Sequence, residues 1–203
     1  MGENTSAAVQ DHVTPDRFRS VLGQFCSGVT VVTAMGPAGP VGFTCQAFSS
    51  LSLRPPRVAL GVSRSSASWP VIRESGSFCV NVLARSQHPL SERFARSGGE
   101  KFREVAWDPS PDGAPRLTGA SAWIDCRLHA EYDGGDHFVV IGDVRRAESP
   151  AEPREPLLYH RGRYRRIADL GITDPGSGGA RAPGTSGAAG SSGAAKPSGG
   201  SGG

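Results

Sequence analysis

Long hydrophobic runs are absent from this sequence of 203 residues. No window approaches the roughly 18–20 apolar residues that a membrane-spanning helix needs, and the N-terminus lacks the charged-then-apolar pattern of a secretion signal. The two absences predict a soluble, cytoplasmic protein with no membrane partner.

Cysteine is also scarce, with four residues that lie far apart and form no C-x-x-C pair. This spacing excludes the usual zinc and dithiol motifs, so no metal site is expected. Three of the four lie in apolar runs, where a free cysteine behaves as a small hydrophobic residue. Cys45 is the exception, because both a redox-active role and a merely small side chain remain open for it.

The excess of positive charge is small, with a formal net charge of +3. Basic residues are scattered except for Arg161, Arg163, Arg165 and Arg166. Their near-alternation is typical of the exposed face of a strand rather than of a nucleic-acid patch. No nucleic-acid partner is therefore expected.

Large side chains are missing from the C-terminal end, where 27 of the 33 residues from Gly171 to Gly203 are Gly, Ser, Ala or Pro. Such a segment buries too little apolar surface to offset the entropy of ordering it. We therefore expect disorder at residues 169–203 and at the polar, unpatterned residues 1–13. The remaining residues, 14–168, have the usual size of one domain.

The pattern within residues 14–168 is mainly that of β-structure. A helix should start after the N-cap Thr14, with Phe18, Val21, Leu22 and Phe25 forming one buried face. Two more short helices are expected, and β-branched or apolar runs mark the strands. The predicted helices are Ala67–Glu74 and Pro89–Ala95, and the predicted strands are Val29–Thr33, Val41–Ala47, Arg57–Ser63, Ser77–Leu83, Trp123–Tyr132, Phe138–Ala147, Leu157–His160 and Tyr164–Ile167.

This order has no regular β-α alternation, which indicates an antiparallel barrel or sandwich with a few short helices at its edges. A Rossmann nucleotide site is excluded by the lack of a G-x-G-x-x-G turn.

Three segments carry side chains suited to ligand binding. Gly42–Pro56 combines closely spaced hydroxyls with small residues that let a flat ligand approach the backbone, although an edge strand running into a serine-rich loop has the same composition. Ser63–Ser68 could bind an anion at a helix start or simply cap that helix. In Gly134–Val144, Asp136 can orient His137 toward a ligand, or the pair can cap a turn.

The order of these segments is more specific than any one of them. The chain resembles the flavin reductase family, whose members have the FMN-binding split-barrel fold and serve as reductase components of two-component monooxygenases. The matching motifs follow one another in the family's order and are Gly28–Thr33, Gly42–Thr44, Phe48–Pro56, Phe78–Leu83, Phe94–Ala95, Lys101–Phe102, Gly135–His137, Ile141–Val144 and Pro156–Tyr164.

The resemblance implies a homodimeric NADH- or NADPH-dependent oxidoreductase. It would reduce FMN or FAD by hydride transfer and pass the reduced flavin to a separate monooxygenase. His137 would face the nicotinamide, helped by Arg161 and Tyr164. The residues implied at the flavin are Thr44, Cys45, Gln46 and Ala47 along the ring, and Ser49, Ser50, Ser63, Arg64, Ser65, Lys101 and Phe102 at or near the phosphate end.

Two departures from the family pattern bear on the site. Cys45 and Gln46 stand where members commonly carry Ala and then Asn or Ser, and Arg54 stands where many have Asp before the double proline. Two alternatives also stay open: a split-barrel flavoprotein that keeps its flavin and acts directly on an organic substrate, and a non-catalytic barrel that binds flavin or haem. The choice between FMN and FAD, and between the two nicotinamides, stays open as well.

Overall fold

The computed structural model of the chain describes residues 13–168. The ends expected to be disordered, 1–13 and 169–203, lie outside the described residues apart from Val13. The elements are α1 (Pro15–Leu22), β1 (Ser27–Gly28), β2 (Thr30–Gly36), β3 (Gly39–Cys45), β4 (Phe48–Leu53), β5 (Pro56–Ser63), α2 (Trp69–Ser75), β6 (Ser77–Val82), the 3-10 helix η1 (Arg85–Gln87), α3 (His88–Ala95), β7 (Trp107–Pro109), β8 (Pro115–Leu117), β9 (Ala122–Asp133), β10 (His137–Glu148), β11 (Leu158–His160) and β12 (Arg163–Arg165).

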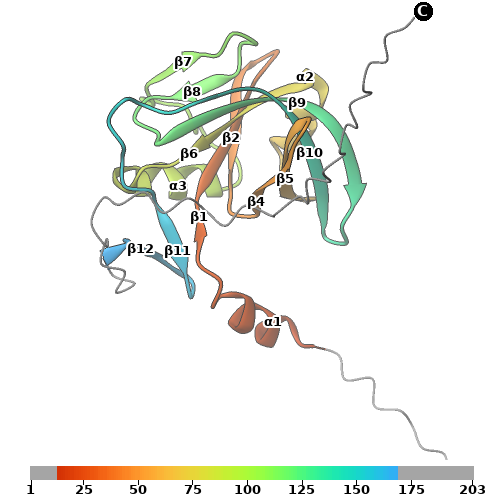
Figure 1. The fold of residues 1–203 in the computed structure, drawn as a ribbon. Coiled ribbons are helices and arrows are strands. Elements are labelled where there is room, and N and C mark those ends of the chain that lie inside the picture. The colour runs from red at the N-terminus through yellow and green to blue at the C-terminus, as the bar shows by residue number, and fades with distance from the viewer. Residues whose placement is uncertain (1–12, 169–203) are drawn as a thin grey trace, which may run out of the picture. The chain divides into compact units, whose positions relative to one another are not determined.

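The largest sheet has seven strands in the order β3-β2-β6-β9-β10-β5-β4, and all neighbours are antiparallel. Its edge strands β3 and β4 are consecutive in the chain and are joined only by Gln46 and Ala47. The sheet must therefore curl until its two edges approach, yet no ladder joins β3 to β4 within the described residues. The result is the expected mainly β, antiparallel split barrel (Figure 1).

Strand β2 has apolar residues on both faces because each face packs against a different cluster. Val32 and Ala34 belong to the cluster inside the barrel, together with Phe43 and Phe78. Val31 belongs to a second cluster, which the chain from α3 to β8 and the small sheet β1-β11-β12 help to build. The sequence of a strand that is buried on both faces is a continuous run of apolar, often β-branched residues, without the usual alternation of apolar and polar residues.

Helix α1 begins as the sequence predicts, since the Thr14 hydroxyl accepts a hydrogen bond from the Arg17 N–H. The prediction that its apolar face is buried is wrong for the single chain. Phe18, Val21 and Leu22 are 57%, 58% and 51% exposed, and Phe25 just beyond the helix is 76% exposed. Figure 1 shows α1 projecting away from the barrel strands, so no element within residues 13–168 covers this face.

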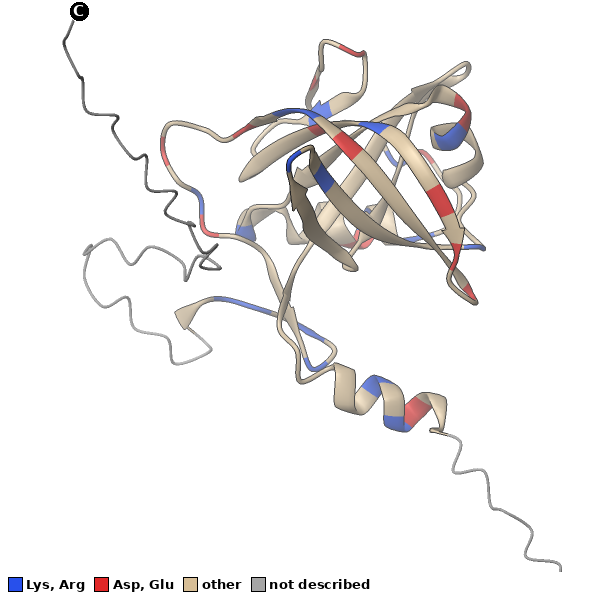
Figure 2. Ribbon diagram, turned by 45° about the vertical axis from the view of Figure 1, so that its right-hand side comes forward, with Lys and Arg blue, Asp and Glu red and all other residues tan. Residues whose placement is uncertain are grey.

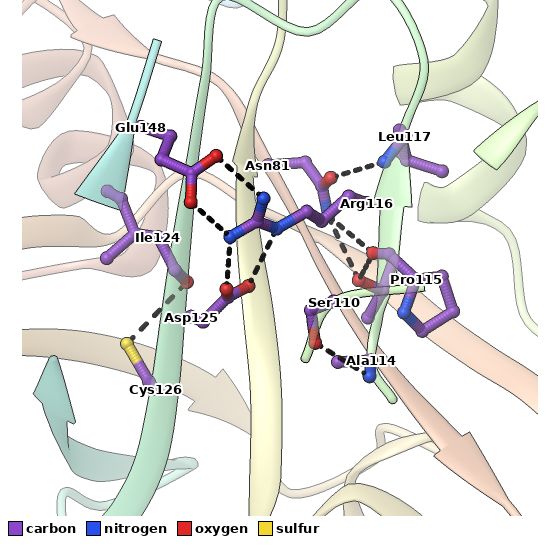
Figure 3. A network of polar contacts seen from close by, with 11 residues as sticks. Asn81, Ser110, Ala114, Pro115, Arg116, Leu117, Ile124, Asp125, Cys126 and Glu148 are labelled. Carbon is purple, nitrogen blue, oxygen red and sulfur yellow. Dashed lines mark hydrogen bonds and ion pairs between the residues drawn. The ribbon is translucent and has the colours of Figure 1, made fainter. Parts of the chain in front are cut away.

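A buried polar network fastens the β7-β8 hairpin to the barrel (Figure 3). The Arg116 guanidinium donates to Asp125 at 2.5 and 3.3 Å and to Glu148 at 2.9 and 3.0 Å. The Asn81 side chain donates to the Val31 carbonyl at 3.0 Å and accepts the Leu117 N–H at 2.6 Å. Asn81 and Asp125 are buried, whereas the Glu148 side chain is 52% exposed. The hydrogen-bond partners of the buried groups therefore decide whether their burial stabilises the fold.

Charges of both signs are interspersed along the ribbon, often on the same strand (Figure 2). Arg161 lies in the β11-β12 turn rather than on a strand, Arg163 is exposed and Arg165 is half-buried.

No helix between residues 13 and 168 is long and apolar enough to cross a membrane. The same residues contain no group of three or more His, Cys, Asp or Glu side chains that could hold a metal ion.

All four cysteines are unpaired, and Cys45, Cys79 and Cys126 are buried. Burial raises the pKa of Cys45 and of Cys126 from 9.0 to about 12. Burial, with the charge of Asp125 adding to it, also raises the pKa of Cys79. These three thiols are therefore protonated, and inert as nucleophiles, at neutral pH.

We expect only the partly exposed Cys26 to react with a thiol reagent in the native protein at pH 8, and four thiols after unfolding.

The raised pKa of the buried thiols also makes the free energy of unfolding depend on pH. Because the fold favours the thiol form, the stabilisation from Cys45 and Cys126 is intact below pH 9, the ordinary pKa of a thiol in the unfolded chain. It is lost as the pH rises from 9 toward 12, by up to about 1.4 kcal/mol per pH unit for each thiol. Titration with a chromogenic disulfide and urea unfolding between pH 8 and 11 would measure both effects; rapid labelling of a second native thiol would contradict them.

Candidate functional site

A pocket of about 780 Å³ lies where the edges β3 and β4 of the barrel approach, and we call it the split pocket. Its size is in the range of pockets that hold cofactors and other small ligands. It is lined by Leu22, Phe25 and Ser27, by residues 43–49, by Ala59, Leu60, Gly61, Ser63, Ser65, Ser66 and Ala67, by residues 94–97 and Lys101, and by His137 and Val139.

The β3-β4 connection supplies backbone groups to the split pocket. The N–H groups of Gln46 and Ala47 have no hydrogen-bond partner among the described residues, and both residues line the pocket. Gly61 on β5 lets this connection come close, because a Cβ there would lie 2.8 Å from the Ala47 Cβ. The Gly61 N–H donates to the Ala47 carbonyl at 2.8 Å, which fixes the approach. The connection can therefore offer backbone donors to the polar edge of a flat ligand.

Of the serine hydroxyls predicted to bind the phosphate, some line the split pocket and others do not. Ser49, Ser63 and Ser65 line it, and the hydroxyls of Ser63 and Ser65 are 2.8 Å apart. Ser50, the next residue along β4, does not line it. Hydroxyls and N–H groups bind phosphate oxygens without requiring a positive charge.

Lys101 provides a cation at one end of the split pocket. Its ammonium donates to the carbonyls of Gly42 and Phe94, both at 3.1 Å, which leaves one of its three donors for a ligand. Partial burial lowers the pKa of Lys101. An anion placed here would stabilise the charged form and be stabilised by it.

His137 stands at the start of β10, at the mouth of the pocket, with its side chain 48% exposed. Its Nδ1 lies 2.7 Å from the Asp136 carboxylate, the pairing that the sequence suggests. This hydrogen bond is the main reason why the pKa of Asp136 is lowered. The carboxylate orients the ring and leaves Nε2 for a ligand.

Arg64 contacts the β9-β10 turn instead of the split pocket. Its guanidinium donates to the Gly135 carbonyl at 2.7 Å and to Asp133 at 2.5 Å, and it lies 4.4 Å from the centre of the Phe138 ring. The turn that carries His137 is thus fastened to the end of β5.

Tyr164 is also remote from the split pocket but is connected to its wall. The Tyr164 hydroxyl lies 2.9 Å from the buried Ser91 hydroxyl, and the Ser91 carbonyl accepts a hydrogen bond from Thr44 Oγ1 at 2.6 Å. Phe102 packs edge-on against Phe94 and lines a neighbouring cavity rather than this pocket.

The remaining two predicted residues differ in their placement. The Arg161 N–H donates to the Gly23 carbonyl at 2.9 Å, so this residue fixes the C-terminal end of α1 and not the pocket. Cys45 borders the split pocket, but its thiol faces the barrel core and lies 3.5 Å from the carbonyls of Ala47 and Gly61. This geometry matches the interpretation of Cys45 as a small packing residue.

Two residues that sequence reasoning missed are Ser27 and Arg96. Ser27 Oγ is buried without a hydrogen-bond partner among the described residues, and Ser27 lines the split pocket. Arg96 lines the same pocket just after α3. A single serine beside a strand has no distinctive pattern, but the Arg93, Arg96, Lys101, Arg103 spacing around a Gly-Gly pair could have drawn attention to Arg96.

Comparisons with known proteins agree with this geometry. The pattern of the flavin reductase like domain matches residues 22–168. The flavin-dependent monooxygenase reductase subunit HsaB of Rhodococcus jostii is 48% identical over 158 residues, 78% of this chain and 80% of that protein. The FMN reductase (NADH) SmoA of Agrobacterium fabrum is 39% identical over 151 residues, 74% of this chain and 85% of that protein. The structure of the Streptomyces globisporus NADH:FAD oxidoreductase SgcE6 with NAD and FAD fragments matches with a TM-score of 0.72 and 34% identity, covering 83% of this chain and 99% of that one.

Proposed function

Because the chain belongs to the flavin reductase like family, we propose that it reduces FMN or FAD with a hydride from NADH or NADPH. The reduced flavin then leaves to supply a separate flavin-dependent monooxygenase, the kind of system for which the Rhodococcus relative is named. Residues 14–168 would form the catalytic domain.

The observation that carries this proposal is the composition of the split pocket. Its polar wall consists of backbone N–H groups, hydroxyls and one ammonium group. The pocket is open because it lies between the edge strands β3 and β4, which do not pair with each other. Such a surface binds and orients a flat, phosphorylated ligand without forming a covalent bond to it. When bound, a flavin supplies the hydride-accepting chemistry, so the protein has to contribute only binding and orientation.

The residues that line the split pocket suggest the following assignment. The backbone at Gln46 and Ala47, together with Thr44 and Cys45, would lie along the ring system of the flavin. Ser49, Ser63, Ser65 and Lys101 would bind its phosphate. His137, oriented by Asp136, would face the nicotinamide.

Most of the predicted residues that do not line the split pocket would act indirectly, by positioning residues that do. Tyr164 would position Thr44 through Ser91, and Arg64 would position His137 through the β9-β10 turn. Phe102 would hold Phe94, which forms part of the pocket wall, and Arg161 would hold the end of α1. Ser50 has no contact that suggests a role.

Ser27 offers a test of whether a polar ligand fits the pocket. A buried hydroxyl without a partner destabilises the free protein by about 1–3 kcal/mol. A ligand with a polar atom at this position would satisfy it. The unpartnered Ser27 hydroxyl is therefore consistent with a ligand such as flavin, whose ring edge carries several hydrogen-bonding atoms.

The Ser27→Ala variant should show two opposite changes. Without ligand, its free energy of unfolding should rise by about 1 kcal/mol, because the unsatisfied hydroxyl is gone. The dissociation constant for flavin should rise about threefold to tenfold, because one hydrogen bond is lost. Thermal melts without ligand and flavin-fluorescence titration would measure these changes. A variant that is less stable and binds flavin unchanged would show that Ser27 has a purely structural role.

The function itself is tested by following NADH and NADPH oxidation by the purified chain, with and without added FMN, FAD and riboflavin. Turnover that rises with free flavin is the expected result. A protein that retains flavin through purification and ignores added flavin would instead support direct action on an organic substrate. A chain that binds flavin without oxidising either nicotinamide would support a non-catalytic role.

We also propose a cytoplasmic homodimer. The exposed apolar residues Phe18, Val21, Leu22 and Phe25 form the kind of patch that a second subunit covers. Leu22 and Phe25 line the split pocket, so a subunit packed on this patch would also border the site. Four unpaired thiols are typical of proteins in a reducing compartment.

A further inference from the structure

The loop that follows α3, residues 96–104, borders the split pocket and two further cavities; we call it the α3 loop. The larger cavity, about 760 Å³, lies between this loop and residues 40–42, 67 and 68. The smaller, about 370 Å³, lies between the loop and Arg93. Lys101 lines all three spaces. A ligand whose phosphate is held at Lys101 therefore has room to continue beyond it.

The α3 loop and the last turn of α3 together carry more positive than negative charge. Arg93, Arg96, Lys101 and Arg103 line the smaller cavity, against two carboxylates, Glu100 and Glu104. Both carboxylates lie beside Arg103, at 3.7 and 4.0 Å. The remaining three cations have no carboxylate partner among the described residues.

Arg96 is the cation best placed to meet a ligand that leaves the split pocket. It lines both that pocket and the smaller cavity. Its exposed side chain has no hydrogen bond or ion pair with any described residue. A guanidinium binds phosphate through paired N–H groups more specifically than an ammonium does.

The backbone next to Arg96 leaves space for a bulky group. Gly98 and Gly99 have φ of +71° and +76°, and a Cβ at either position would meet no atom within 4 Å. They line both outer cavities. The surface of the loop is thus open where the ligand would pass.

We propose that the α3 loop binds the adenosine diphosphate half of a dinucleotide flavin, which makes FAD the preferred substrate. Lys101 would hold the phosphate that FMN and FAD share, Arg96 the second phosphate, and the larger cavity the adenosine. This inference rests on the proposed function, because it takes the flavin ring to lie in the split pocket. It goes further by assigning the preference for FAD to Arg96 and to the larger cavity, which would contact only the adenosine monophosphate part that FMN lacks.

The experiment is equilibrium binding of riboflavin, FMN and FAD to the full chain, followed by flavin fluorescence without nicotinamide. Wild-type protein should bind FAD more tightly than FMN. The Arg96→Gln variant should raise the dissociation constant for FAD about tenfold or more and that for FMN less than about threefold, with riboflavin unchanged. The matched control is Arg145→Gln, which removes one exposed arginine at the other end of β10 from His137 and should change none of the three.

The outcomes separate this inference from the function on which it rests. Equal weakening of FMN and FAD would place Arg96 at the shared phosphate and overturn the inference. Unchanged FAD binding by Arg96→Gln would overturn it too, as would a wild type that does not prefer FAD. A wild-type chain that binds no flavin at all would refute the proposed function itself.

Discussion

Replacing Arg116 by alanine is expected to lower the free energy of unfolding by about 3–5 kcal/mol, the usual penalty for leaving a buried charge without its partner. The Arg116 and Asp125 side chains are only 15% and 2% exposed. Without the guanidinium, the Asp125 carboxylate keeps its desolvation and loses two charge-assisted hydrogen bonds. The β7-β8 hairpin also loses one of its links to β9 and β10 (Figure 3).

Urea unfolding followed by circular dichroism would measure this loss. The matched control is Arg127→Ala on β9, because that side chain is 60% exposed and lies 3.9 Å from Asp112. An exposed ion pair of this kind contributes at most about 1 kcal/mol. The double variant Arg116→Met with Asp125→Leu should be more stable than Arg116→Ala, because it leaves no buried charge unpaired. If Arg116→Ala and Arg127→Ala cost the same, burial of the pair is not what stabilises this region.

Much of the barrel could be predicted from the sequence because its strands are long and apolar. β9 and β10 differ from their predicted bounds by one residue at each end. The short strands β4, β7 and β8 were not predicted. Phe48–Leu53 contains three serines among its six residues and lies at an edge of the sheet, where one side of the strand has no pairing partner. It therefore lacks the apolar run of a central strand.

Helix α1 shows a second limit of prediction from sequence. The spacing of Phe18, Val21 and Leu22 correctly indicates an amphipathic helix. The same spacing predicts that another surface packs against this apolar face, but it does not indicate whether that surface belongs to the same chain or to another. Among residues 13–168 nothing covers this face, and sequence periodicity alone could not reveal this.

The candidate site was predictable where its residues follow one another in the chain. Thr44 to Ala47 and Ser49 lie together in the split pocket because they are consecutive or nearly so. Arg64 and Tyr164 are predicted from the sequence to contact the ligand because they are close in sequence to pocket residues or lie in family motifs. Their side chains turn elsewhere, since each finds a stronger partner: Asp133 for Arg64 and Ser91 for Tyr164. Side-chain direction depends on such tertiary partners, which a linear pattern does not contain.

Replacing His137 by alanine is expected to slow reduction of bound flavin by about 10- to 100-fold, the range expected when reacting groups lose their alignment. Flavin binding should change less than about threefold, since in the proposed arrangement other groups hold the ring edge and the phosphate. His137 stands at the mouth of the split pocket with Nδ1 committed to Asp136, so only Nε2 can contact a second ligand. With the flavin placed as proposed, that position suits the nicotinamide, which would approach the flavin from the open side.

Anaerobic stopped-flow mixing with NADH would give the reduction rate, and fluorescence titration would give flavin affinity separately. His129→Ala is the matched control, because this histidine lies on the adjacent strand β9, bonds to Asp143 and does not line the pocket. Asp136→Asn should reduce the rate less than His137→Ala, since it keeps the ring but weakens its orientation. A folded His137→Ala protein that no longer binds flavin would place His137 on the flavin side. An unchanged reduction rate in His137→Ala would show that His137 does not contribute to hydride transfer.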